Sequence, residues 1–232
     1  MISLASFSFL SFLDVVAIGV ILILWGGIGW RIEHPSLKRP STSLIMAGYR
    51  RQWMDQMTGR EVRIFDAQII GTLRQATSFF ASTCVIAIGG ALALIGNAEQ
   101  VAGVAADLTQ TRDPAIVWEV KLLVIVMFLT SAFLKFVWSN RLFGYCSVIV
   151  GATPNTPGDP KSSAFASKAA QLNITAARSF NRGLRTLYFG LASVAWLAGP
   201  IPLIAAAITT CVVIWRREFA SQSRKALLED VI

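Results

Sequence analysis

Long apolar runs that hold almost no charge are the feature that most constrains how this chain folds. Each run is about 20 residues long, the length of helix that crosses a hydrocarbon layer of ~30 Å at a rise of 1.5 Å per residue. Hydrophobic residues make up 54% of the 232 residues and charged residues 15%, against roughly 45–50% and 25% in ordinary soluble domains. The sequence therefore predicts an all-α fold, a polytopic transmembrane helical bundle with four to five membrane-crossing helices and amphipathic cytoplasmic helices.

The whole chain, residues 1–232, is expected to form a single integral membrane domain. The segments expected to cross the membrane are residues 9–30, 75–96, 115–138, 185–199 and 202–216. The last two are separated by Gly199-Pro200-Ile201-Pro202, where the prolines remove backbone donors and disfavour a continuous helix. We expect an external turn here between two short crossings. The alternative is one kinked crossing, which would bring the total to four.

Lysine and arginine are concentrated between the apolar runs. Because basic residues favour the cytoplasmic side of a membrane, segments 31–74 and 139–184 are predicted to be cytoplasmic and the loop 97–114 external. Within the cytoplasmic segments, residues 60–74 and 164–185 are expected to be helical. These assignments predict a multi-pass protein of the cell (inner) membrane, with its N-terminus outside and its C-terminus in the cytoplasm.

Recognisable signatures of catalysis and metal binding are absent from the sequence. The only histidine, His34, cannot by itself form a histidine-rich metal site, and the three separated cysteines give no disulfide framework. We therefore expect no catalytic residue, no metal and no cofactor. The net charge of +8 is explained by basic flanks beside anionic lipid, so no nucleic-acid partner is expected.

Four ionisable residues in the expected crossings are candidates for a polar path through the membrane: Asp14, Glu119, Lys121 and Lys135. Such groups are costly in a bilayer and usually face protein or water. The alternative is that Glu119, Lys121 and Lys135, each within a turn of an interface, extend their charged ends to the headgroups.

A second candidate site is formed by Arg178, Arg182 and Arg185, which are spaced i, i+4 and i+7. This spacing places all three on one face of the helix that enters the membrane. Such a stripe would bind lipid phosphates or another anionic ligand at the cytoplasmic surface. The alternative is ordinary anchoring of the helix in the headgroup layer.

Much of the chain resembles the membrane proteins grouped as domain of unknown function 599. The resemblance is strongest over residues 119–154, which include Lys135-Phe136-Val137-Trp138-Ser139, Arg141, Tyr145 and Gly151-Ala152-Thr153-Pro154. Other matching residues are His34-Pro35, Tyr49-Arg50-Arg51-Gln52-Trp53, Glu61, Gln68, Gly183-Leu184-Arg185, Tyr188-Phe189, Trp196 and Gly199-Pro200. The resemblance implies a multi-spanning membrane protein of bacteria and plants with no assigned reaction. Members often have Asn before the tyrosine, where this chain has Gly144.

Three functions are compatible with these features. The favoured hypothesis is a non-enzymatic membrane protein that binds membrane lipids or organises a partner complex, as a homo-oligomer or with another membrane protein. The alternative is a small channel or transporter for an ion or small solute. A third is a lipid-modifying enzyme in which Glu61 or Asp66 acts as base, but no nucleophile is paired with a base in the sequence.

Overall fold

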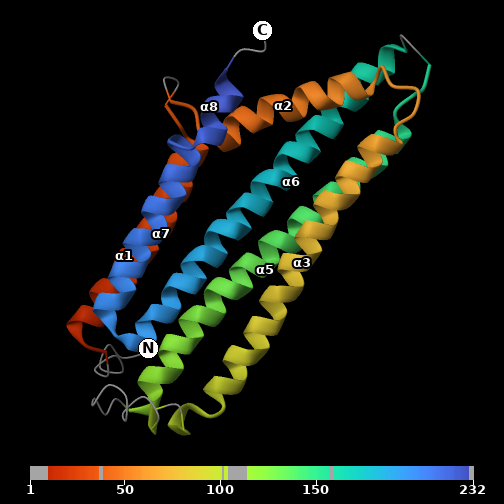
Figure 1. The fold of residues 1–232 in the computed structure, drawn as a ribbon. Coiled ribbons are helices and arrows are strands. Elements are labelled where there is room, and N and C mark those ends of the chain that lie inside the picture. The colour runs from red at the N-terminus through yellow and green to blue at the C-terminus, as the bar shows by residue number, and fades with distance from the viewer. Residues whose placement is uncertain (1–9, 37–38, 101, 104–113, 157–158, 230–232) are drawn as a thin grey trace, which may run out of the picture. The chain divides into compact units, whose positions relative to one another are not determined.

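A computed structural model describes residues 10–36, 39–100, 102–103, 114–156 and 159–229. Helices joined by turns make up this part of the chain, and it contains no strand. The elements, labelled in Figure 1 where there is room, are α1 (Phe12–Glu33), α2 (Thr42–Met57), α3 (Ile64–Ile95), α5 (Ala115–Ala152), α6 (Pro160–Ser193), the 3₁₀ helix η2 (Val194–Ala198), α7 (Pro200–Phe219) and α8 (Gln222–Leu228). The prediction of an all-α fold is confirmed.

Four helical stretches of the described chain are long and apolar enough to cross a membrane: Phe12–Glu33, Ile64–Ile95, Ala115–Ala152 and Pro200–Leu228. The crossing expected at residues 185–199 is shared between the end of α6 and η2 and stays a prediction. α3 and α5 have 32 and 38 residues, or about 48 and 57 Å of helix. Both exceed the ~30 Å hydrocarbon layer, so each crossing continues into its polar flank without a break.

The chain divides into two compact units, which are described separately. Unit 1 consists of Met1–Trp30, Cys84–Ala132 and Arg185–Trp215, and unit 2 of Arg31–Thr83, Phe133–Leu184 and Arg216–Ile232. Unit 2 holds 18 of the 21 Lys and Arg residues but only 8 of the 13 Asp and Glu residues. It therefore carries a formal charge of +10, whereas unit 1 carries −2.

The core of unit 1 is centred on the α5 residues Leu122, Ile125 and Leu129. Side chains from α3, α6 and η2 pack against them: Ile88, Ile95, Leu187 and Leu197. Trp25 of α1 packs edge-on against Phe128 at 5.5 Å between ring centroids. Its indole nitrogen also donates to the Thr186 hydroxyl at 3.2 Å, so α1 is joined to both α5 and α6.

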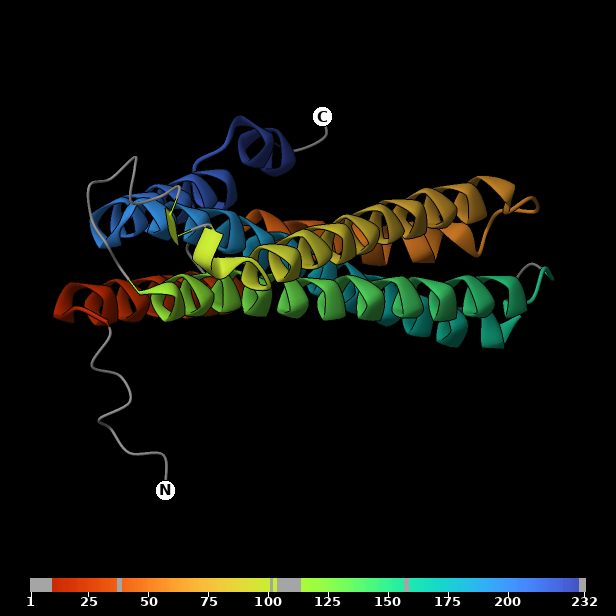
Figure 2. The same cartoon turned by 90° about the horizontal axis from the view of Figure 1, so that it is seen from below.

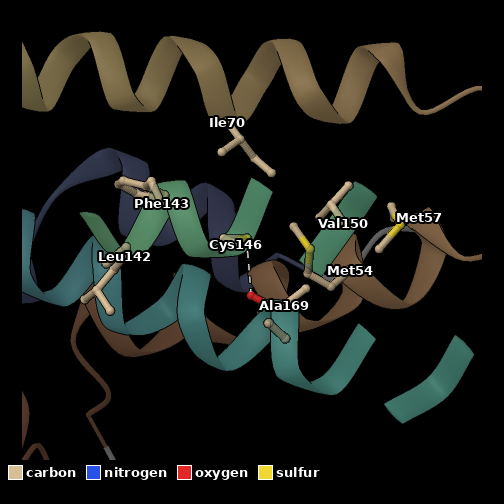
Figure 3. Packing of buried hydrophobic residues seen from close by; sticks show 10 residues of the cluster. Met54, Met57, Ile70, Leu142, Phe143, Cys146, Val150 and Ala169 are labelled. Carbon is tan, nitrogen blue, oxygen red and sulfur yellow. Dashed lines mark hydrogen bonds between the residues drawn. The ribbon is translucent and has the colours of Figure 1, made fainter. Parts of the chain in front are cut away.

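The core of unit 2 brings together four helices. Its buried members are Met54 and Met57 of α2, Ile70 of α3, Leu142, Phe143, Cys146 and Val150 of α5, and Ala169, Ala170 and Ala176 of α6. Ile70 points from α3 toward Cys146, whose thiol lies 3.5 Å from the Ala169 carbonyl oxygen (Figure 3). Alanine on α6 lets its backbone approach the larger side chains of α5. Within this unit α3 and α5 lie side by side in both views (Figures 1 and 2).

Three phenylalanines of unit 2 form a cluster beside a glycine of α6. Phe136 stacks on Phe80 at 5.4 Å and contacts Phe180 at 5.6 Å between ring centroids. A Cβ atom on Gly183 would lie only 2.7 Å from the Phe136 ring. The absence of a side chain at Gly183 is therefore what allows α6 to pack this closely against the ring.

The chain reverses direction between α6 and α7 at Gly199 (Figure 1). Gly199 has φ of +119°, a conformation that only glycine adopts without strain. Its amide donates to the Trp196 carbonyl at 2.9 Å, and Pro200 then begins α7, where a missing amide hydrogen costs nothing. The helix therefore breaks within the segment where the sequence predicts a turn.

Candidate functional site

A buried carboxylate lies at the start of α1 in unit 1. Asp14 is only 8% exposed. One of its oxygens accepts a hydrogen bond from the Trp196 indole nitrogen at 2.7 Å. The other accepts from the Ser11 hydroxyl at 2.6 Å and from the Ser11 amide at 3.1 Å. Asp14 therefore joins α1 to η2 through polar contacts that exclude solvent.

Lys121 of α5 is a buried cation whose charge acts on this carboxylate. It is 4% exposed, its ammonium lies 4.7 Å from the centre of the Trp118 ring, and it is close enough to Asp14 for electrostatic attraction. This burial does not fit an ammonium that extends to the headgroups. Glu119 is half-buried on the same helix, and Lys135 belongs to unit 2. The structure thus brings together two of the four predicted polar-path residues, Asp14 and Lys121.

The three arginines predicted to form an anion-binding stripe on α6 have different surroundings. Arg178 is exposed, whereas Arg185 is buried and belongs to unit 1. The Arg182 guanidinium donates through two nitrogens to the two carboxylate oxygens of Glu33. These hydrogen bonds raise the pKa of Arg182, against the opposing effect of burial. The three side chains therefore do not present three equally available cations.

The acidic residues considered as catalytic bases are Asp66 and Glu61. Asp66 is fully buried, and one of its oxygens accepts hydrogen bonds from the Trp53 indole at 2.7 Å and from the Arg60 guanidinium. Through these bonds the Asp66 carboxylate fixes the turn between α2 and α3. Glu61 is exposed.

Two further arginines of unit 2 have structural partners. Arg63 donates to the Pro154 carbonyl oxygen at 2.7 Å, just after the end of α5. Arg50 of α2 donates to the side-chain oxygen of the buried Asn173, beside Cys146. Burial lowers the pKa of Arg50, partly offset by Cys146. These contacts attach α2, and the turn that follows it, to α5 and α6. No sequence motif predicted them.

An exposed basic and aromatic strip on α5 was missed as a site by the sequence analysis. Trp138, Arg141 and Tyr145 are all exposed and follow one another at helical spacing. The Arg141 Nε donates to the Tyr145 hydroxyl at 2.6 Å, and its guanidinium carbon lies 5.8 Å from the centre of the Tyr145 ring. The signal that could have found the strip is this i, i+3, i+7 spacing.

Exposed cations occur throughout the described part of unit 2. They are Arg39, Arg51, Arg74, Arg141, Lys161, Lys168, Arg178, Arg182, Arg216, Arg217 and Lys225. Within the residues that the structure describes, no group of three or more His, Cys, Asp or Glu side chains is placed to bind a metal ion. The described surface of unit 2 is therefore rich in exposed cations.

One of three comparisons with known proteins finds a match to the chain. No curated protein and no solved structure matches the chain. The family described as "Protein of unknown function, DUF599" matches residues 16–223, and the four long apolar helices are those of a multi-pass integral membrane protein. The chain therefore belongs to the DUF599 family of proteins of unknown function.

Proposed function

We propose that this is a non-enzymatic integral membrane protein that binds anionic lipid headgroups at the cytoplasmic face of the cell (inner) membrane through unit 2. The observation that carries the proposal is the unequal charge of the two units, +10 in unit 2 against −2 in unit 1. A Lys or Arg side chain near an anionic leaflet contributes about 1 kcal/mol of attraction. Several of the exposed cations acting together give a clear preference for anionic lipid.

The strip on α5 supports the same proposal at the level of single residues. Tryptophan is enriched at the depth of the lipid headgroups, and Trp138 is exposed one turn before Arg141 and two turns before Tyr145. An exposed arginine next to an interfacial tryptophan is at the right depth to meet lipid phosphates. The aromatic residues fix this depth and the cation supplies the attraction.

The preference for anionic lipid can be measured with spin-labelled lipids added to the full-length protein in phosphatidylcholine vesicles. We expect spin-labelled phosphatidylglycerol to associate about fivefold more strongly than spin-labelled phosphatidylcholine, which corresponds to ~1 kcal/mol. Because salt screens exposed charges, the preference should decrease markedly between 0.05 and 1 M salt, as the Debye length falls to ~3 Å. Equal association of the two lipids at low salt would contradict the proposal.

The proposal requires unit 2 to face the cytoplasm. Segments 31–74 and 139–184 must then lie on the same side of the membrane as the C-terminus. Thr42 and Ser43 of α2 bond to residue Glu218 through their hydroxyls, so the end of α7 lies beside α2. With the turn at Gly199, this arrangement favours five crossings over four.

A reporter fused after Ile232 checks this orientation. We expect a fluorescent protein at this position to be bright and alkaline phosphatase to be inactive, because the fluorescent protein folds in the cytoplasm and the phosphatase is active only outside. The same pair of reporters fused after Gln100, in the loop predicted to be external, should give the reverse result. Active phosphatase with a dark fluorescent fusion after Ile232 would mean four crossings.

A small channel or transporter for an ion or small solute is the second candidate. The buried pair of Asp14 and Lys121 favours it, because ionisable residues within membrane-crossing helices often belong to transport pathways. The surroundings of the pair weaken the case for a channel or transporter. Asp14 is engaged by Trp196 and Ser11, and Trp118 covers Lys121. Such contacts fix a helix junction as well as they would line a path.

A further inference from the structure

We propose that Arg74 of α3 and Arg141 of α5 form a specific binding site for the phosphate of an anionic lipid. This inference rests on the lipid binding proposed above and assigns it to one place. Both residues are exposed members of unit 2. The ligand class is a phosphate ester, whose oxygens match the planar guanidinium group of arginine.

Arg74 is held against α5 by its backbone, while its side chain is available. The Asn140 amide donates to the Arg74 carbonyl oxygen at 3.0 Å, and to the hydroxyls of Thr77 and Ser78 at 2.8 Å each. These three bonds fix this part of α3 beside one turn of α5. Within the described part of the chain, no hydrogen bond or ion pair involves the Arg74 guanidinium.

Gly144 provides the room for the Arg74 guanidinium beside α5. A Cβ atom built on Gly144 would lie 3.9 Å from the guanidinium carbon of Arg74, and outside the adjoining turns of its own helix no other described atom would be within 4 Å. An alanine fits in this space, whereas a longer side chain would occupy the place of the guanidinium. The glycine therefore lets the cation of α3 lie against the surface of α5.

Arg141 supplies the second cation on the same turn of α5. Its Nε is used in the bond to Tyr145, which orients the group and leaves its two terminal nitrogens for a ligand. No aspartate or glutamate occurs in residues 67–95 of α3 or 120–152 of α5. The two guanidinium groups therefore lie beside adjacent residues, 144 and 145, on helices that provide no carboxylate to neutralise them.

The residues before Arg141 on α5 indicate that the anion belongs to a lipid. Leu134 and Val137 are exposed apolar side chains, followed by the exposed Trp138. Along one helix the surface thus changes from aliphatic to interfacial aromatic and then to cationic. This order matches an acyl chain, a glycerol region and a phosphate. Free phosphate has the same headgroup chemistry but gains nothing from the apolar part.

Native mass spectrometry of the full-length protein in detergent tests the site, with phosphatidylglycerol, phosphatidylcholine and inorganic phosphate as probes. We expect Arg74→Gln and Arg141→Gln each to weaken the first phosphatidylglycerol binding about tenfold, the usual effect of losing a charge-assisted hydrogen bond. Arg51→Gln is the matched control, since it removes an exposed cation from α2 in the same unit. It should weaken binding clearly less than either site variant, because it loses only the attraction that all the exposed cations share. Circular dichroism establishes that each variant is folded.

Gly144→Leu separates geometry from charge. It leaves every cation in place but fills the space of the Arg74 guanidinium, so we expect the same tenfold loss as for Arg74→Gln. Gly144→Ala should bind as the wild type does, because its Cβ makes only an ordinary contact. Inorganic phosphate at the same concentration as the lipid should leave the lipid bound. Displacement of the lipid by phosphate would overturn the assignment to a lipid.

The outcomes distinguish this site from the broader proposal. If Arg74→Gln and Arg141→Gln behave like Arg51→Gln while the wild type still prefers phosphatidylglycerol to phosphatidylcholine, the site is wrong and lipid binding by unit 2 stands. If the wild type shows no such preference, the lipid-binding proposal itself fails.

Discussion

Replacing Lys121 by methionine is expected to lower the free energy of unfolding, by no more than the ~3–5 kcal/mol that removing one partner from a buried ion pair costs. Methionine keeps the length and apolar contacts of the lysine stem but leaves the Asp14 carboxylate without its neighbouring cation. Asp14 cannot turn to water, because it is 8% exposed and held by Trp196. The loss appears as a lower yield of folded protein and a lower midpoint of denaturant unfolding in detergent.

The double variant Lys121→Met with Asp14→Asn is the control for this prediction. Asparagine can still accept the bond from Trp196 but carries no charge, so much of the lost stability should return. A methionine variant as stable as the wild type would show that Lys121 does not neutralise Asp14. Transport by this pair would then lose its main support as well.

Gly183→Ala is expected to lower the free energy of unfolding by about 1–3 kcal/mol, the cost of overpacking a buried contact. The new methyl group would lie 2.7 Å from a Phe136 ring atom. The ring cannot easily move away, because Phe80 stacks on it and Phe180 packs beside it. Thermal unfolding of the purified protein measures the change.

Gly71→Ala is the matched control, since Gly71 lies in α3 of the same unit with nothing within 4 Å of an added Cβ. Alanine favours helix over glycine by about 0.5–1 kcal/mol, so this variant should be slightly more stable than the wild type. The double variant Gly183→Ala with Phe136→Leu should recover part of the loss. Equal stability of Gly183→Ala and Gly71→Ala would show that the Phe136 contact is not tight.

The positions of the long helices were predictable because lipid imposes a minimum apolar length. Their ends were not, since hydropathy marks where a helix leaves the bilayer and not where it stops. The helix predicted at 60–74 and the crossing predicted at 75–96 form one helix, α3, which begins at Ile64, and α5 continues to Ala152, past the predicted end of its crossing at residue 138. Arg74 and Arg141 lie in these continuations, and arginine is a good helix former.

α2 was not predicted because it has no apolar run, and its buried residues Met54 and Met57 are separated by polar ones. A usable signal was nevertheless present at its start. Ser41 follows Pro40, and its hydroxyl accepts from the Leu44 amide at 3.3 Å as a helix N-cap. The position of α2 depends on partners distant in sequence, such as Asn173 for Arg50.

In the candidate sites, too, the sequence identified individual residues but not the partners that they contact. Asp14 and Lys121 could be selected because charge is rare in membrane-crossing segments, but only the folded chain shows that both are buried and that the charge of Lys121 acts on Asp14. The spacing of Arg178 and Arg182 was correct, yet the bond from Arg182 to Glu33 joins residues 149 apart. Arg74 and Arg141 went unnoticed because periodicity describes one helix at a time.

Assembly of unit 1 can start at the Gly199 turn. The entropy lost on closing a loop increases with the number of residues enclosed, and a single residue joins η2 to α7. Pro200 and Pro202 have little backbone freedom to lose, because their rings already restrict φ in the unfolded chain. The bond from Trp196 to Asp14, by contrast, joins residues 182 apart. η2 and α7 can thus pair as soon as both have been synthesised. Asp14 enters the membrane much earlier and can bond to Trp196 only after residue 196 has been synthesised.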